Sequence, residues 1–464
     1  MKKVALLLFW LLSSASLLAQ EIQRLSFEDY IQWVQEFHPI SIQADLNLRL
    51  GQMEVRKARG GFDPMLYGNL DKKEFNQSTY FEKREVGVLV PTWMGVELMG
   101  NFEQNSGAYL NSERAVPTNG LLAAGAALNL GQGLLLDDRR ATLQKAKLYE
   151  QATEVERLNF RNELNLQATA AYWKWAAAFE NKLVLEEGVK LAEVRFNGIK
   201  RSYELGDQAA IDTVEALSQL LNRQYRLQLA DISFFENTQV LNTYLWNDSG
   251  EPMQLDSAII PQTLSQFLSP APEAEELRTL VGRHPELLLT DFDLATLNVE
   301  KRLRTQELLP VVKLKYNFLT ENLADARPSP LFENNYKWGL TVYTPLFLRK
   351  TRGELGSTIA KLEIKQTGRN LKEQQLRTKL EAELNSWNVL NQQVRTLAEN
   401  VKSLDALLIG ETRRFEIGES SLFLVNAREV AVFDARVTLN ELSSRLQIAY
   451  AKARFAAGIG FAEN

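Results

Sequence analysis

The distribution of proline constrains the fold of this 464-residue chain more than any other feature. All thirteen prolines lie outside two long stretches, residues 118–251 and 346–464. A proline inside an α-helix costs about 3 kcal/mol, and both stretches are rich in helix-favouring Leu, Ala, Glu, Gln, Lys and Arg. We therefore predict a helix from about Asp137 to Leu205, about 100 Å long at about 1.5 Å per residue, and a counterpart in the second stretch.

Each predicted long helix ends near a single glycine, Gly206 or Gly418, after which the helical pattern resumes. Glycine adopts the positive φ that lets a helix stop and the chain turn back. Helices of this length resemble those of coiled coils and need neighbours along their whole length. The sequence therefore predicts two long helical hairpins.

The two hairpins belong to an internal repeat. With a shift of 246 residues, the His-Pro dipeptide at 38–39 falls on the His-Pro dipeptide at 284–285. Further along, Trp173 falls on Trp387 at a shift of 214, so the second copy is about 30 residues shorter. The missing residues lie between positions 64 and 173. This pattern predicts one structural half that occurs twice.

The proline-bearing segments alternate between apolar and polar residues, as strands do. The clearest are "VVKLKYNFL" from Val311 and "YKWGLTVY" from Tyr336; "GVELMGNFE" from Gly95, "LYGNLDKK" from Leu66 and "REVGVLV" from Arg84 are less regular. Such alternation suits a wall that is apolar towards lipid and polar towards a lumen, and equally the half-buried strands of a soluble sheet. Residues 64–131 hold more strand candidates than the second copy, so an extra surface hairpin is an alternative there.

The first nineteen residues have the features of a secretory signal peptide: Lys2 and Lys3 precede an apolar run, and small residues lead to Ala19. The chain has no cysteine, so its stability must come from packing or assembly rather than disulfides. We predict a signal peptide at 1–19, a first structural repeat at 20–250, an inter-repeat linker at 251–272 and a second repeat at 273–464. The net charge of −5 makes nucleic acid an unexpected partner.

The order helix, strands, long helix, turn, long helix resembles the TolC-like outer membrane efflux protein family, the outer membrane channels of tripartite export systems. The resemblance covers essentially the whole mature chain. It is carried by "DPMLYGNL" and "LPVVKLKY", by "LGQGLL" and "YTPLFL", and by "YELGDQAAIDTVEA" and "FEIGESSLFLVNA". It implies an α+β fold: the hairpins of three protomers form a periplasmic α-barrel, and their strands contribute to a shared outer-membrane β-barrel.

The resemblance also implies a function without catalysis or cofactor. Such a homotrimer is the passive exit duct of an efflux or type I secretion system in the outer membrane of a Gram-negative bacterium. It docks a periplasmic adaptor and an inner-membrane pump. By resemblance, the adaptor-docking tips are Leu205, Gly206, Asp207, Ile417, Gly418 and Glu419. A simple helix turn is the alternative for the residues that flank the glycines.

The family often narrows its periplasmic entrance with rings of acidic residues, and Asp212 lies near that zone in the first repeat. The second repeat carries Leu422, Phe423 and Leu424 there instead. These four residues are the candidate gate, which would be mixed or apolar and would close partly by dewetting. Alternatively, Asp212 is the N-cap of the returning helix.

Other classes of protein fit less well. His38 and His284 are the only histidines and are too few for a zinc site. We instead predict that each following proline opens a helix, with histidine in the N-cap place. No nucleophile motif or phosphate loop suggests an enzyme. A periplasmic coiled-coil adaptor or scaffold is the alternative. Adaptors usually have one hairpin, whereas two hairpins preceded by amphipathic strands favour a channel.

Overall fold

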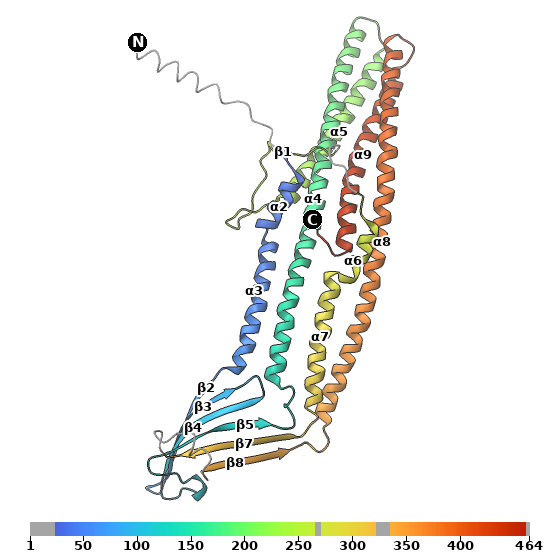
Figure 1. Cartoon of the computed structure of the whole chain (residues 1–464). Coiled ribbons are helices and arrows are strands. Elements are labelled where there is room, and N and C mark those ends of the chain that lie inside the picture. The colour runs from blue at the N-terminus through green and yellow to red at the C-terminus, as the bar shows by residue number, and fades with distance from the viewer. Residues whose placement is uncertain (1–23, 265–270, 322–334, 461–464) are drawn as a thin grey trace, which may run out of the picture. The chain divides into compact units, whose positions relative to one another are not determined.

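The computed structural model describes residues 24–264, 271–321 and 335–460 (Figure 1), so the predicted signal peptide at 1–19 and part of the predicted linker lie outside the described residues. The chain divides into two compact units. We call Met1–Asp45, Arg157–Pro285 and Glu373–Asn464 the helical unit, and Leu46–Glu156 and Glu286–Lys372 the strand unit. Each unit draws on both sequence repeats, so the compact units are a different division of the chain from the repeats.

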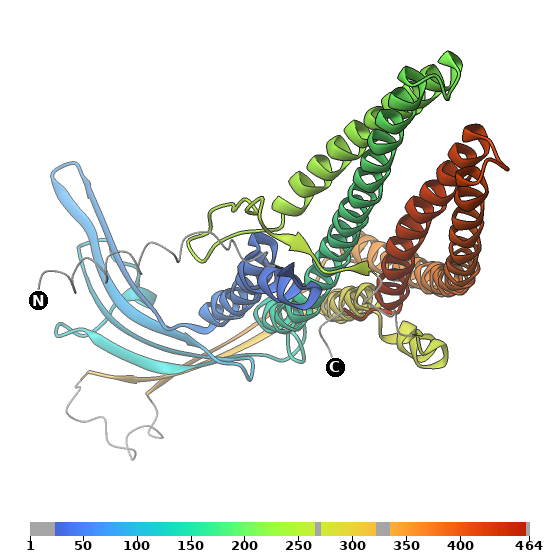
Figure 2. The same ribbon diagram turned by 90° about the horizontal axis from the view of Figure 1, so that it is seen from above.

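The described residues contain eight α-helices (Figure 1). They are α2 (Phe27–Phe37), α3 (Pro39–Arg59), α4 (Asp138–Glu204), α5 (Ala210–Asn242), α6 (Ala274–Leu280), α7 (Pro285–Gln306), α8 (Arg349–Glu416) and α9 (Leu422–Ala456). The predicted long helix is confirmed, since α4 has 67 residues and α8 has 68. The hairpins α4–α5 and α8–α9 are also confirmed, and Figure 2 shows each as a pair of adjacent helices.

The two His-Pro dipeptides mark helix starts, as predicted. Helix α3 begins at Pro39 and α7 begins at Pro285. Proline suits this first position because its missing N–H has no partner inside the helix and its fixed φ is already helical. The repeated dipeptide therefore has a conformational role.

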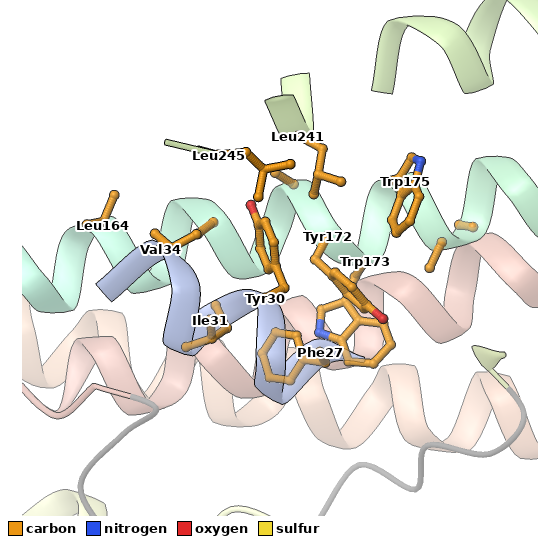
Figure 3. Packing of buried hydrophobic residues seen from close by; sticks show 14 of the residues in the cluster. Phe27, Tyr30, Ile31, Val34, Leu164, Tyr172, Trp173, Trp175, Leu241 and Leu245 are labelled. Atoms are coloured by element: carbon orange, nitrogen blue, oxygen red, sulfur yellow. The ribbon is translucent and has the colours of Figure 1, made fainter. Parts of the chain in front are cut away.

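Aromatic side chains form the main core of the helical unit (Figure 3). Tyr172, Trp173 and Trp175 of α4 are fully buried, and the Phe27 ring of α2 lies 5.1 Å from the Trp173 ring, centroid to centroid. The Tyr172 hydroxyl donates to the Leu25 carbonyl oxygen at 2.7 Å. It thereby anchors β1 (Arg24–Leu25), which pairs in parallel with β6 (Ile260–Pro261). Burying several aromatic rings together gives this unit a large apolar area removed from water.

The second hairpin uses a different packing. Trp387 of α8 packs with Leu446 and Ala449 of α9, while alanines along α9 allow close helix approach; Ala449, Ala451, Ala453 and Ala456 are buried. The equivalent tryptophans Trp173 and Trp387 thus both lie in cores: the first lies in a cluster with several aromatic rings, and the second in a smaller cluster against which Tyr450 packs.

The strand unit contains a six-stranded antiparallel sheet in the order β2-β3-β4-β5-β7-β8. The strands are β2 (Met65–Phe75), β3 (Ser78–Pro91), β4 (Val96–Ser106), β5 (Leu121–Asn129), β7 (Val311–Thr320) and β8 (Tyr336–Tyr343). All predicted strands are confirmed, and β5 is an additional one. The extra hairpin considered for residues 64–131 lies in the sheet itself, because β3 pairs with β4 along ten residues.

The sheet has one apolar face and one polar face. Directly paired residues on neighbouring strands share a face, so the register sorts the side chains. One apolar row crosses all six strands through Leu66, Val88, Gly100, Ala124, Phe318 and Tyr336. The other face carries charged residues. Among them, Glu97 of β4 forms an ion pair with Lys313 of β7 at 2.9 Å. This pattern places the apolar side chains towards lipid if the sheet lies in a membrane.

Short apolar contacts and ion pairs join the helices of the strand unit. Leu136 and Ala141, at the start of α4, pack with Val299 and Leu303 of α7. Arg369 of α8 forms an ion pair with Asp291 of α7 at 2.5 Å. Along residues 24–264, 271–321 and 335–460, no helix combines the length and the hydropathy that crossing a bilayer requires.

Candidate functional site

Both long helices of the helical unit end in the same hydrogen-bonded turn. After α4, Gly206 donates to the Tyr203 carbonyl at 3.0 Å and Asp207 donates to the Ser202 carbonyl at 2.9 Å. After α8, Gly418 and Glu419 make the equivalent bonds at 3.0 and 2.8 Å. This pair of bonds defines a Schellman motif. The glycines have φ of +88° and +80°, which explains the residue type at both turns.

The two turns present the same chemistry to solvent. Leu205 is 72% exposed and Ile417 is 70% exposed, each immediately before its glycine. An acidic residue, Asp207 or Glu419, follows each glycine and is also exposed. Exposed apolar side chains on a rigid turn are suited to contact with a partner. All six predicted tip residues therefore lie at the two turns; their docking role stays a prediction.

The returning helices start differently. Helix α9 has Ser421 as its N-cap, whose side chain accepts from the Leu424 N–H, whereas α5 has Ala209 as its N-cap and no side-chain cap. Asp212 is the third residue of α5, so the alternative that Asp212 is the N-cap is wrong. Its carboxylate in the first turn still interacts favourably with the helix dipole. Leu424 is the third residue of α9 and occupies the equivalent position.

The four candidate gate residues do not share one environment. Leu422 is only 5% exposed and packs with Ile199 of α4 and Ala216 of α5, so it belongs to the core of the helical unit. Phe423 is 65% exposed, Leu424 is exposed and Asp212 is half-buried. A gate formed by these positions would therefore consist of Asp212, Phe423 and Leu424, with Leu422 holding the helices in place.

An exposed apolar residue beside the candidate gate was not predicted. Ile211 precedes Asp212 and is exposed, as Phe423 is before Leu424. The internal repeat contains the signal that could have found it, since a shift of 212 residues places Ile211 on Phe423. Both returning helices therefore begin with an exposed apolar side chain at their second position.

A buried charged cluster lies below the turns and joins three helices. Glu429 of α9 is 2% exposed and accepts hydrogen bonds from Arg195 of α4 and Arg223 of α5. Arg223, which is 5% exposed, also donates to the Gly188 carbonyl at 3.0 Å. Asn426 accepts from Arg195 at 3.1 Å. This cluster fixes the first hairpin against the second, and sequence reasoning missed it.

The two arginines keep Glu429 ionised. Burial by itself raises the pKa of the Glu429 carboxyl, but the hydrogen bonds and positive charges of Arg195 and Arg223 outweigh burial and leave that pKa below its ordinary value. The carboxylate is thus a fixed negative charge between two guanidinium groups.

The histidines have separate structural roles. The Nδ1 atom of His38 accepts from the Ile40 N–H at 3.2 Å, which is the N-cap role predicted for it, and burial lowers the pKa of His38. The Nε2 atom of His284 lies 3.2 Å from the Phe455 carbonyl oxygen. The part of the chain that the structure describes contains no group of three or more His, Asp or Glu side chains that could hold a metal ion.

Part of the chain matches a known protein family. Residues 277–459 match the family model described as outer membrane efflux protein. A search of curated proteins by sequence finds no significant match.

Solved structures match over nearly the whole chain. The channel CusC aligns with a TM-score of 0.67 and 15% identity, covering 93% of this chain and 92% of CusC. The outer membrane protein VceC of Vibrio cholerae aligns with a TM-score of 0.65 and 15% identity, covering 94% of this chain and 96% of VceC. The CmeC outer membrane channel of Campylobacter jejuni aligns with a TM-score of 0.64 and 12% identity, covering 94% of this chain and 87% of CmeC. At these identities the matches establish a shared fold with outer membrane channels, and the family match covers residues 277–459 of this chain.

Proposed function

We propose that three copies of this chain form an outer membrane channel, the passive exit duct of a tripartite efflux or type I secretion system. The observation that carries the proposal is the two-faced sheet, whose edge strands have no further partner among the described residues, in a chain whose long helices turn back at two exposed glycine turns. A single copy has too few strands to close a wall around a lumen, so assembly must supply the rest. The periplasmic adaptor alternative is less favoured, because the family match over residues 277–459 and the fold shared with CusC both support a channel.

In this proposal the hairpins of three copies line a tunnel in the periplasm, and the two turns receive a periplasmic adaptor. Leu205 and Ile417 supply the apolar contacts, and Gly206 and Gly418 keep the turns tight. Asp207 and Glu419 provide negative charge at the rim of each contact. An inner-membrane pump then loads substrate through the adaptor, and the channel itself performs no chemistry.

The entrance is narrowed by three copies of Asp212, Phe423 and Leu424 around the axis. Asp212 makes the constriction favourable for cations, while Phe423 and Leu424 allow it to close by dewetting. Leu422 does not line this constriction, because its side chain packs between helices.

The test combines fractionation with conductance. The protein should be recovered from outer membranes in detergent as a trimer, and the purified trimer should form ion-conducting pores in planar bilayers. Recovery as a monomer from the soluble periplasmic fraction would contradict the channel and support the adaptor alternative.

A further inference from the structure

The two outer strands of the sheet are open to further pairing. Within the described residues, β2 pairs only with β3, and β8 pairs only with β7. Every residue of both strands is exposed. An unpaired edge strand presents a row of backbone donors and acceptors that readily accepts another strand. Both edges of this sheet therefore have the capacity to bind a partner strand.

The directions of the two edge strands are complementary. Strand β2 follows α3, so it runs away from the end of the sheet where the helices attach, and β8 runs back to that end and leads into α8. The β3–β4 turn lies at the same end, since Arg139 near the start of α4 pairs with Glu97 at 3.0 Å. Pairing β8 of one copy with β2 of another would continue the antiparallel alternation of the sheet.

Both faces of the sheet continue to its edges. The apolar row that crosses the sheet starts at Leu66 of β2, which is 81% exposed, and ends at Tyr336 of β8. On the polar face, Tyr67 of β2 donates to Glu85 of β3 at 2.9 Å. The β2–β3 hairpin thus has the same lipid-facing and lumen-facing sides as the other four strands, which is expected of a wall strand rather than a surface projection.

We propose that β8 of one copy pairs antiparallel with β2 of the next, so that three copies close a wall of eighteen strands. The proposal rests on the trimeric channel proposed above and adds its wall. The second repeat contributes two strands, β7 and β8. If the first repeat also contributed only two, three copies would close a wall of only twelve strands. Because barrel diameter grows roughly linearly with strand number, the β2–β3 hairpin widens the opening about 1.5-fold.

The faces also restrict the register of the new pairing. Tyr67 lies on the polar face of β2, and Lys337, Gly339, Thr341 and Tyr343 lie on the polar face of β8. Paired residues must share a face, so Tyr67 should lie opposite one of these four residues of the neighbouring copy. A residue on the apolar face of β8, such as Leu340, should not lie opposite it.

Cysteine cross-linking tests the proposal, because the chain has no cysteine of its own. Tyr67→Cys is combined in turn with Lys337→Cys, Gly339→Cys, Thr341→Cys and Tyr343→Cys, and outer membranes are analysed on non-reducing gels. One of the four variants should yield a covalent trimer. Ala127→Cys with Lys315→Cys, paired within one copy, is the matched control and should leave the mass of a single chain.

A second pair of cysteine substitutions tests the alternative wall of twelve strands. Asn101→Cys with Gly339→Cys would link β4 to β8 of the next copy if the β2–β3 hairpin stood outside the wall. A covalent trimer from this pair, or an uncross-linked trimer in all four β2–β8 variants, overturns the eighteen-stranded wall. Light scattering of the unmodified protein is the separate test of assembly: a monomer there refutes the proposed channel itself.

Discussion

Arg223 of α5 donates a hydrogen bond to Glu429 of α9 in a place where both side chains are buried. Two charges removed from water must compensate each other, and here Arg195 of α4 supplies a second cation. The pair joins helices of different hairpins, so it couples the two repeats within one copy. Its contribution to stability can be measured directly.

Glu429→Gln should destabilise the protein strongly. Removing one charge from a buried pair leaves the other uncompensated and costs about 3–5 kcal/mol. Asp434→Asn is the matched control, because Asp434 lies on the same helix and pairs with Arg226 but is half exposed; such pairs contribute about 0–1 kcal/mol. The measurement is the free energy of unfolding in denaturant for the purified protein in detergent. Equal losses in the two variants would show that the buried cluster has no special role.

The effect of Glu429→Gln should depend on pH. The pKa of Glu429 is lowered in the folded protein, so its ionised form contributes stability above the unfolded pKa of about 4.3. That contribution is lost as pH falls through the folded pKa, because the Glu429 carboxylate is then protonated in the folded protein as well as in the unfolded chain. The difference in unfolding free energy between wild type and variant should be full at pH 7 and shrink below about pH 4. A difference independent of pH would mean that packing, not charge, causes the loss.

Gly206→Ala and Gly418→Ala should each destabilise the protein by about 1–2 kcal/mol, because an alanine at positive φ is strained. Gly198→Ala is the matched control. It lies inside α4 and, like both turn glycines, has open space around the added methyl group. Since alanine favours helix, the control should be stabilising by up to about 1 kcal/mol. Thermal unfolding midpoints of the three variants give the comparison, and the same sign for all three would contradict it.

The double substitution Leu205→Asp and Ile417→Asp should abolish export while the trimer and its conductance persist. Both side chains are exposed in the single copy, so their replacement leaves the core intact. Charged residues there would remove the apolar contact proposed for the adaptor. Survival of a toxic substrate in cells reports export, and Leu205→Met with Ile417→Val should retain it. Unchanged export by the aspartate variant would exclude these residues from docking.

Asp212→Asn should reduce the preference of the pore for cations, because three carboxylates around the axis would be neutralised. The measurement is the reversal potential in planar bilayers under a salt gradient. Asp207→Asn, at the exposed turn, is the control and should change selectivity less. If both variants changed the selectivity equally little, Asp212 would not line the constriction. Its role would then be limited to the interaction with the dipole of α5, which contributes about 0.3–1 kcal/mol.

The helices could be predicted closely because their signals are local. Proline exclusion and a turn glycine place the ends of α4 within one residue of Asp137 and Leu205. The alternating strands β7 and β8 were equally visible. Strand β5 was missed because its sequence "LLAAGAALN" has small apolar residues on both faces, so no alternation remains. The tip turns followed from glycine, but the buried Leu422 could not be told from its exposed neighbours.

The buried cluster had a weaker signal. Arg223 and Glu429 are 206 residues apart, and charged residues on a long helix ordinarily face water. In α5, however, Arg223 follows Ala216 and Leu220 at core spacing, and both are buried. A charge within an apolar stripe was thus the available clue. Its partner could only be found once the second hairpin was packed against the first.

The first repeat has one hairpin more than the second, and a hairpin such as the segment from Met65 of β2 to Gly95 in the β3–β4 turn has the length of the shortfall of about 30 residues. A hairpin adds strands in pairs and returns the chain to the end from which it left. The helices that follow therefore keep their direction and their partners whatever the number of hairpins. In the proposed channel, the width of the wall can therefore change by whole hairpins without any change in the helices.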